Sequence, residues 1–430
     1  MKKSLYFYIV LITCLFSCLG NEDPEPVNIT DPDPVNILDD ELRVNILPNY
    51  ISNQNEVWVI LHTLDGKPID SRKIEGESSL LFKVDNSQRY HLTTYKKSEF
   101  NGSKVELLES FTHISVIEDL SLGLAAPATQ GAEQDGEFNV EISHTSTPFG
   151  ASVFGSNRTY AASGMQVGPR INLRVYRPKG SDEYFLMARD GLGDIRYERL
   201  NVPNPGVTIT RTFSDLKPFD QVFSYPASNF SDFQFTCLGF KDSENSLEYR
   251  HIINTNQLGL LNDDLHPSLT HQIGFLDDIK NYHLIINGTR ISSPNTSFTY
   301  HLIGPKPESL DLPESKEVQV PSTSISDFQV SISSEDTNWT AKWDQSEPFT
   351  GDTFMTLKWT IKGNESKANL TLPSELTEDK PKLQDLSKFS LQSVSLTNHS
   401  LSYDEQIRKS LITGPKIEPV KFTVITRRFE

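Results

Sequence analysis

The chain has 430 residues, enough for several domains of ordinary size, and it carries a formal net charge of −17. Such an acidic chain repels phosphate backbones and offers no basic stripe, so nucleic acid is excluded as an expected partner. We attribute the acidity to the solubility of an exposed protein rather than to an acidic binding patch.

The N-terminus has the pattern of a signal peptide over residues 1–17. Lys2-Lys3 precede an apolar run, Leu5–Phe16, that is too short to span a bilayer as a finished helix. The run ends in Leu15-Phe16-Ser17-Cys18, which resembles the lipobox of bacterial lipoproteins, although Phe16 departs from the usual small or aliphatic residue. The resemblance implies acylation of Cys18 and anchoring in the outer membrane. The alternative is an ordinary cleaved signal whose cysteines are merely tolerated as small apolar residues.

Residues 18–40 form an acidic, proline-bearing segment that cannot bury a core. Prolines at this density keep a chain extended, so we expect a disordered tether that lifts the folded part off a membrane. An acidic run directly after the lipidated cysteine also resembles the surface-export signal of some outer-membrane lipoproteins, which implies that the protein faces outward. After export, Cys237 has no disulfide partner and is expected to be a buried, inert thiol.

The rest of the chain shows short runs rich in β-branched and aromatic residues between turn residues, which indicates an all-β protein. Val57–Leu61 is continuously apolar, as expected of a central strand covered on both faces. Asp65-Gly66 follows it as a hairpin turn. Met355, Leu357, Trp359 and Ile361 alternate with polar residues, so one face of that strand is expected to be buried.

Two internal repeats suggest duplicated domains. Residues 43–46 and 56–60 match residues 170–173 and 183–187 at a constant offset, and residues 226–235 match residues 321–330 with five identities in ten positions. Repeats about a hundred residues apart suit β-sandwich domains better than a solenoid, whose period is roughly 20 to 50 residues.

We therefore predict tandem antiparallel, Ig-like β-sandwich domains over residues 41–124, 135–225, 226–320 and 321–430. Within the second domain, Ser143–Gly168 is expected to be a surface loop or a loosely ordered connection, and its aromatic residues Phe149, Phe154 and Tyr160 to be a candidate exposed surface. The first domain resembles transthyretin-like or carboxypeptidase-regulatory-like modules, and the fourth resembles fibronectin type III or immunoglobulin-like modules. These resemblances imply a fold and almost no function.

Motifs for catalysis or metal binding are missing from the sequence. It contains no His-Glu-x-x-His, Cys-x-x-Cys or Gly-x-Ser-x-Gly, and Gly191-Leu192-Gly193 is interpreted as a hairpin turn. Asp263-Asp264 and Asp277-Asp278 could hold Ca²⁺, but we interpret them as solvated acidic turns. No catalytic residue, metal ligand or cofactor is assigned. A triad or carboxylate pair assembled in space stays possible.

Tryptophans in the fourth domain are the most suggestive feature. Trp339 and Trp343 share one side of a strand, and Trp359 lies on the next expected strand. Flat aromatic rings can stack on sugar rings, so these three residues are candidate glycan-stacking residues. The alternative, which we favour, is that they fill the sandwich core, as tryptophans commonly do in such domains.

The tether, the repeats and the missing motifs together indicate a non-catalytic lipoprotein on the surface of a bacterial outer membrane, whose modules serve binding or adhesion. A polysaccharide or another outer-membrane protein is the expected partner. One alternative is a glycan-active or peptidase lipoprotein with an unrecognised site, in which Ser143–Gly168 is an active-site loop. Another alternative is a structural component of the cell envelope whose modules act only as a spacer at the surface.

Overall fold

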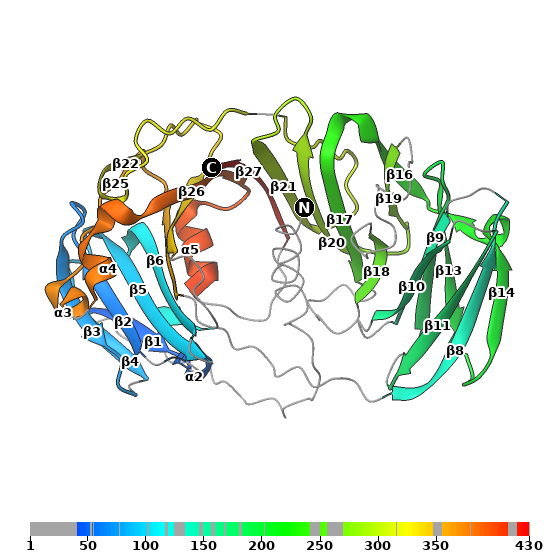
Figure 1. Cartoon of the computed structure of the whole chain (residues 1–430), viewed down its shortest axis with the longest axis horizontal. Helices are drawn as coiled ribbons and strands as arrows, with labels where there is room; N and C mark the ends of the chain where they lie inside the picture. Colours follow the sequence, from blue (N-terminus) through cyan, green and yellow to red (C-terminus); the bar gives the residue numbers. More distant parts are fainter. Residues whose placement is uncertain are drawn as a thin grey trace.

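Figure 1 shows the computed structural model of the chain, an arch built mainly of β-strands. Among the residues that the structure describes, strand makes up 61% and helix 9%, which confirms the predicted all-β class. The structure describes residues 41–429 apart from the following gaps: 52–53, 55, 77, 101–102, 117–118, 124–133, 146–148, 156–159, 167–168, 180–182, 202, 241–249, 256–269, 315, 347–354, 379 and 412–418. The predicted signal peptide, the predicted tether and Cys18 lie outside the described residues.

Strand pairing divides the chain into four units. Unit 1 contains β1 (Glu41–Ile46), β2 (Glu56–His62), β3 (Pro68–Lys73), β4 (Ser79–Lys83), β5 (Arg89–Phe100), β6 (Ser103–Ser115) and β7 (Leu120–Leu122). Unit 2 contains β8 (Gln134–Ser143), β9 (Phe149–Gly155), β10 (Tyr160–Gln166), β11 (Arg170–Pro178), β12 (Glu183–Arg189), β13 (Ile195–Asn201), β14 (Thr208–Thr212) and β15 (Lys217–Pro218).

Unit 3 contains β16 (Gln221–Pro226), β17 (Phe230–Phe240), β18 (Arg250–Thr255), β19 (Thr270–Phe275), β20 (Asn281–Arg290) and β21 (Thr296–Gly304). Unit 4 contains β22 (Phe328–Gln329), β23 (Asn338–Ser346), β24 (Met355–Gly363), β25 (Lys367–Ala368), β26 (Ser390–His399) and β27 (Val420–Arg428). The short helices are α2 (Pro48–Ile51), α3 (Ser374–Thr377) and α4 (Pro381–Gln384), and the longer α5 (Tyr403–Leu411) follows β26.

All four units share one topology. In unit 1 the sheet β4-β1-β7 faces the strand order β3-β2-β5-β6, and unit 2 repeats this as β11-β8-β14 and β10-β9-β12-β13. Units 3 and 4 repeat it as β16-β19 with β18-β17-β20-β21, and as β22-β25 with β24-β23-β26-β27. The second and fifth strands thus lie between the third and sixth. In immunoglobulin constant domains they instead join the first and fourth.

The units are fused rather than strung out. β21 pairs with β27 antiparallel and β24 pairs with β6 in parallel, which produces one twelve-stranded sheet through units 3, 4 and 1. The order in space is therefore 1, 4, 3, 2, and units 1 and 2, neighbours in sequence, stand at opposite ends of the arch (Figure 1). The tandem sandwiches share backbone pairing because strand edges at two of the joints are satisfied by the next unit.

β2 and β12 are buried on both faces because each serves two cores. In β2, Val59 and Leu61 face the core of unit 1 while Ile60 joins the core of unit 4. This confirms the central strand predicted at Val57–Leu61. In β12, Leu186 faces the core of unit 2 while Met187 joins that of unit 3.

The segments matched by the two sequence repeats share a burial pattern, but they do not occupy the same strand position in their units. The first repeat matches β2 with β12, yet β2 is the second strand of its unit and β12 is the fifth. The second repeat gives the same burial pattern at residues 230–235 and 325–330, but these lie at the second strand of unit 3 and the first strand of unit 4. Alternation against a core recurs at several places in each unit, so a match in pattern does not fix the strand that it belongs to.

Two predictions about the second domain need correction. β16 pairs with β19, so residues 221–226 belong to unit 3 and not to the end of a domain at residue 225. Ser143–Gly168 is not a loop throughout, because β9 and β10 pair there as a hairpin, and Phe154 is only 1% exposed. The side chains of Phe149 and Tyr160 lie outside the described residues.

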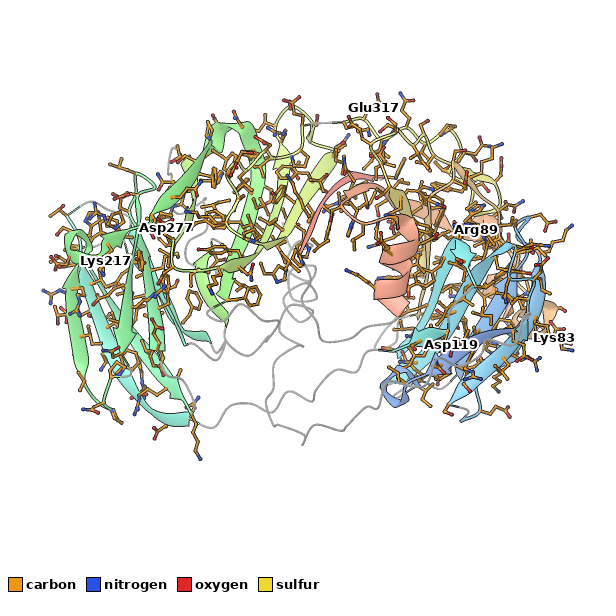
Figure 2. All side chains as sticks on the ribbon, turned by 180° about the vertical axis from the view of Figure 1, so that it is seen from behind. Lys83, Arg89, Asp119, Lys217, Asp277 and Glu317 are labelled. Carbon is orange, nitrogen blue, oxygen red and sulfur yellow. The ribbon has the colours of Figure 1, made fainter. Side chains whose placement is uncertain are left out.

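α5 belongs to unit 4 in sequence but packs on unit 1. Ser402 and Glu405 begin it with a capping box, in which Glu405 accepts from the Ser402 backbone N–H at 2.8 Å and Ser402 Oγ accepts from Glu405 N at 3.3 Å. Tyr403 and Ile407 enter the core of unit 1. Arg89 of β5, labelled in Figure 2, binds Asp404 through two hydrogen bonds of 2.8 and 2.7 Å. Within the described part of the chain, no helix is long and apolar enough to cross a membrane.

Candidate functional site

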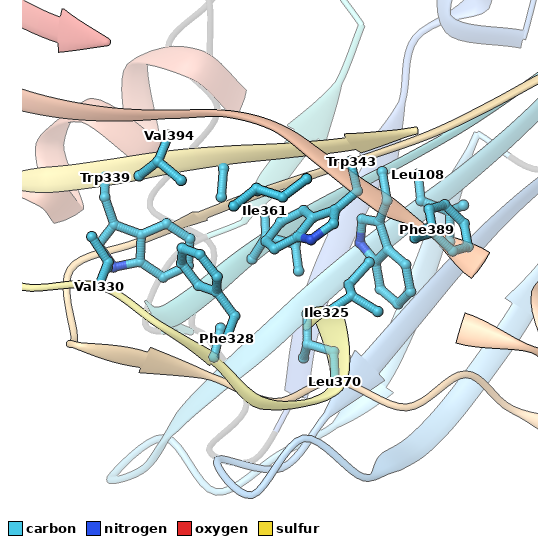
Figure 3. Packing of buried hydrophobic residues seen from close by; sticks show 14 of the residues in the cluster. Leu108, Ile325, Phe328, Val330, Trp339, Trp343, Ile361, Leu370, Phe389 and Val394 are labelled. Carbon is cyan, nitrogen blue, oxygen red and sulfur yellow. The ribbon is translucent and has the colours of Figure 1, made fainter. Parts of the chain in front are cut away.

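The three tryptophans proposed for glycan stacking lie in the core of unit 4 (Figure 3). Trp339 and Trp359 are 0% exposed and Trp343 is 1% exposed. Phe328 packs against two of them, with ring centroids 4.9 Å from Trp339 and 5.0 Å from Trp343. These three tryptophans therefore do not form a surface platform, and they fill the core, which is the interpretation favoured from the sequence. The physical reason is that the segment before β23, with Ile325 and Phe328, folds back over the indoles.

A buried chain of hydrogen bonds leads from Trp359 into unit 1. The indole N–H donates to Ser110 Oγ at 2.8 Å, Ser110 Oγ lies 2.8 Å from Thr93 Oγ1, and Thr93 Oγ1 lies 2.9 Å from His62 Nε2. His62 Nδ1 faces the carbonyl oxygen of Gly66 at 3.3 Å and must donate to it, because a carbonyl oxygen only accepts. Each hydroxyl therefore donates toward His62.

This hydrogen-bonded network contains a serine and a histidine, but it does not expose a nucleophile to a substrate. Ser110, Thr93 and His62 are all 0% exposed, so no substrate atom can approach them. Burial, and to a smaller extent His91, lowers the pKa of His62 to about 4, which keeps the ring neutral as the chain requires. The network therefore joins units 1 and 4, and its role is structural.

The acidic pair considered for Ca²⁺ is engaged by basic side chains. Asp277 accepts a hydrogen bond from Lys306, and Asp278 pairs with Arg199 at 2.5 Å. Asp263-Asp264 lies outside the described residues. Among the residues that the structure places, no three His, Cys, Asp or Glu side chains gather closely enough to hold a metal ion. Cys237 is buried, as predicted, and burial raises the pKa of its thiol.

The strands of units 3 and 4 direct alternate side chains away from their cores, onto a surface that we call the open face. It extends over the adjacent strands β20, β21, β27, β26, β23 and β24. Hydroxyl and amide groups on it pair across strands. Thr299 donates to Asn287 Oδ1 at 2.7 Å, and Ser395 Oγ lies 2.8 Å from Thr426 Oγ1.

Four aromatic rings form a row on the open face, one from each of four adjacent strands. His283 of β20 stacks on His301 of β21, with centroids 4.7 Å apart and planes at 12°. His301 contacts Phe422 of β27 at 4.4 Å, and Phe422 stacks on His399 of β26 at 5.0 Å and 6°. All four residues are partly buried. We call this set the aromatic row, and its middle lies where units 3 and 4 meet.

The local electrostatics keep two of these rings uncharged at neutral pH. Burial lowers the pKa of His301 to about 4, and His399 contributes in the same direction. Burial also lowers the pKa of His399, with Lys409 acting in the same direction and Glu405 opposing it. A neutral imidazole offers a flat ring with one donor and one acceptor nitrogen. Because neighbouring rings of the row stack on one another, the row can present ring edges to a ligand, together with hydrogen-bonding nitrogens.

Sequence reasoning missed the aromatic row because its members come from four strands far apart in the chain. His283 and His301 stand at polar positions of alternating segments, so each could be assigned to an outward face from its own strand. Their meeting depends on the pairing of β21 with β27, which joins two units. No local pattern encodes that register.

Comparison with protein-family models gives no match, and comparison with curated proteins gives none. The resemblances to lipoproteins and to named β-sandwich modules therefore stay predictions.

Proposed function

We propose that the chain is a non-catalytic lipoprotein of the bacterial outer-membrane surface that binds a polysaccharide on the open face of units 3 and 4. The observation that carries the proposal is the aromatic row, with ring centroids 4.4 to 5.0 Å apart across the joint of two units. Adjacent rings on one sheet face suit consecutive sugar units. The C–H groups of a sugar can lie against the outward edges of the rings while its hydroxyls reach the polar side chains beside them.

Hydroxyl and amide side chains on one side of the row support this ligand class. Thr299 and Asn287 follow it on unit 3, and Thr426 and Ser395 lie further along the same direction of the sheet on unit 4. Such groups exchange hydrogen bonds with sugar hydroxyls as readily as with each other. A partner outer-membrane protein would use the same surface through its own hydroxyl and aromatic groups.

Membrane attachment is supported by sequence alone. Residues 1–18 combine a basic start, a short apolar run and a cysteine that resembles an acylation site. Acyl chains on one sulfur would hold the arch to a membrane, and the acidic residues that follow would extend between the two. The open face would then be presented at a distance from the lipid.

Binding of residues 41–430 to an array of polysaccharides tests the ligand class. We expect Phe422→Ala to weaken binding about tenfold, which corresponds to about 1.4 kcal/mol. Tyr176→Ala, which removes a 43% exposed aromatic residue from unit 2, is the matched control and should leave binding unchanged. Equal affinities of the wild-type protein and the Phe422 variant for every bound glycan would exclude the aromatic row as the site.

Metabolic labelling with a radioactive fatty acid tests the anchor. The full-length chain should carry label and fractionate with outer membranes, and Cys18→Ser should lose both properties. Label that persists in the Cys18→Ser variant would place the acyl group elsewhere and reject this part of the proposal.

A structural spacer is the second candidate, and a specific observation favours it. The tryptophans are buried, and the twelve-stranded sheet makes three of the units continuous. A spacer needs stiffness and no ligand. Absence of binding to every glycan, in a protein whose folding is verified by its tryptophan fluorescence, would favour the spacer over the binding protein.

A further inference from the structure

A group of lysines stands on the open face of unit 4, beside the joint with unit 1. Lys358 and Lys362 lie on β24 with Thr360 between them, and Lys342 of β23 lies directly opposite Thr360. Side chains two residues apart on a strand share a face, so the three ammonium groups surround one threonine hydroxyl. We call this set the lysine cluster.

The lysine cluster is only partly neutralised. Lys362 Nζ is 2.7 Å from Glu109 Oε1 of the adjacent β6, and Asp344 lies opposite Lys358. Within the described residues, neither Lys342 nor Lys358 makes an ion pair. Three cations therefore face two carboxylates in a protein whose formal net charge is −17.

The surroundings of Lys342 indicate that its charge is poorly compensated. Although it is an exposed residue, the strands around it desolvate its ammonium group, and this lowers its pKa. Lys362 and Lys358 act in the same direction, while Glu109 opposes them. A cation in this position is stabilised by an anion that arrives from outside.

The next position on the sheet adds a further basic residue and another hydroxyl. Ser393 of β26 lies opposite Lys342, and Arg428 of β27 lies opposite Ser393. The open face thus continues without interruption from the lysine cluster toward the strands that carry the aromatic row.

We propose that the lysine cluster binds the carboxylate groups of an acidic polysaccharide, so that the glycan bound by this protein contains uronic acid units. This inference rests on the proposed glycan-binding function and specifies its substrate class. Ammonium groups provide the charge-assisted hydrogen bonds that a carboxylate accepts, and Thr360 and Ser393 can bond to neighbouring sugar hydroxyls.

The test compares two probes that differ only in charge. Residues 41–430 are titrated with an oligogalacturonate of about ten sugars and with the same oligosaccharide after reduction of its carboxyl groups to alcohols. We expect at least tenfold tighter binding of the acidic form, with a difference that shrinks as salt is added. Equal binding of both forms would reject the lysine cluster and leave the proposed function intact.

Substitutions test whether the preference for the acidic oligosaccharide depends on the lysine cluster. Lys342→Gln combined with Lys358→Gln should remove the preference for the acidic form, so that the variant binds both forms with similar affinity. Lys83→Gln changes the charge at an exposed position on β4, labelled in Figure 2, and should have no effect. A preference that survives the double substitution would overturn the inference.

Two further outcomes separate the hypotheses. Failure of both oligosaccharides to bind, when all other glycans of the array also fail, would reject the proposed function and this inference together. Binding of inorganic polyphosphate as tight as that of the oligogalacturonate would show that the lysine cluster recognises charge alone, and would reject the assignment to an acidic glycan.

Discussion

Units 1 and 2 share one strand order but are joined to the rest of the molecule in different ways. Unit 1 pairs its β6 with β24 of unit 4, and α5 of unit 4 fills part of its core. Unit 2 contacts unit 3 through side chains, with Phe185 and Met187 in a shared core, and no described strand of one pairs with a described strand of the other. The comparison teaches that backbone pairing, more than order along the chain, decides which units act together.

The unfolding of each unit should depend on how it is joined to its neighbours. A change at the joint of units 1 and 4 breaks hydrogen bonds and packing in both, so the two should unfold as one cooperative block. All four tryptophans lie in that block, at positions 58, 339, 343 and 359, whereas Cys237 lies in the core of unit 3. Tryptophan fluorescence and the reaction of Cys237 with a thiol reagent therefore report on different parts of the molecule.

Trp359→Ala is expected to have the largest effect. It removes a fully buried indole and leaves Ser110 without its donor, so we expect a loss of roughly 3 to 5 kcal/mol in the free energy of unfolding. Urea unfolding followed by tryptophan fluorescence measures it. Leu107→Ala, which truncates a 43% exposed side chain on β6 in the same block, is the control and should cost less than about 1 kcal/mol. A loss below 1 kcal/mol for Trp359→Ala would contradict the buried placement.

Gly66→Ala should be next in size. Gly66 has φ +80° in the turn between β2 and β3, and an added Cβ would overlap the backbone oxygen of Asn369 in unit 4. Its carbonyl also accepts a hydrogen bond from Thr371 N at 3.0 Å. We expect a loss of roughly 2 to 4 kcal/mol, because the turn must separate from unit 4.

Gly206→Ala is the matched control for this substitution. Gly206 has φ +78°, nearly the same as Gly66, but no atom lies within 4 Å of an added Cβ. The control isolates the cost of the backbone angle, which is roughly 1 to 2 kcal/mol. Equal losses for the two variants would show that contact between the turn and unit 4 contributes nothing.

Acid should weaken the joint of units 1 and 4 through His62 and His91. Burial lowers the pKa of each to about 4, from 6.5 in the unfolded chain. Below pH 6.5 these two histidines become protonated in the unfolded chain but stay neutral in the folded chain. The free energy of unfolding therefore decreases as the pH falls from 6.5 toward 4. By pH 5 the loss is about 2 kcal/mol for each histidine.

Neighbouring charges modify this effect without reversing it. His113 acts with burial on His91, and Asp65 and two backbone carbonyls oppose it. Unfolding of the wild-type protein at pH 7 and pH 5 measures the change. Substitution His91→Asn should reduce the difference between the two pH values, even if it lowers stability at both. Identical stability of the wild type at pH 7 and pH 5 would contradict the claim that His62 and His91 are buried and neutral in the folded protein.

Asp404→Asn should have the smallest effect. Asp404 is partly exposed and binds Arg89 through two hydrogen bonds of 2.8 and 2.7 Å. Salt bridges of this kind contribute up to about 1 kcal/mol, and salt screens them. We expect a loss of this size at low ionic strength and almost none in 1 M salt. A loss that does not depend on salt would contradict a contribution from the charges of Arg89 and Asp404.

Local features of the fold were predictable from the sequence. The double burial of β2 follows from an uninterrupted apolar run, and the turn at Gly66 follows from Asp-Gly between two strands. The buried face of β24 follows from alternation at Leu357, Trp359 and Ile361. Each of these depends only on neighbours in the chain.

Joints between units were not predictable, because they depend on contacts across hundreds of residues. β24 and β6 are separated by two whole units in sequence, and nothing in either strand indicates a parallel partner. The tryptophans show the same limit. Alternation placed Trp339 and Trp343 on one face, but only the segment before β23, folding back over them, decides that this face is buried. The aromatic row depends on the pairing of β21 with β27 in the same way.

Hydrogen exchange measured by mass spectrometry, on residues 41–430 with and without Gly66→Ala, tests most directly whether units 1 and 4 form one cooperative block. The account predicts that the substitution in unit 1 accelerates exchange together in β5, β6, β23 and β24, while β8 to β14 of unit 2 keep their wild-type rates. Faster exchange confined to β1 to β7, with β23 and β24 unchanged, would contradict it.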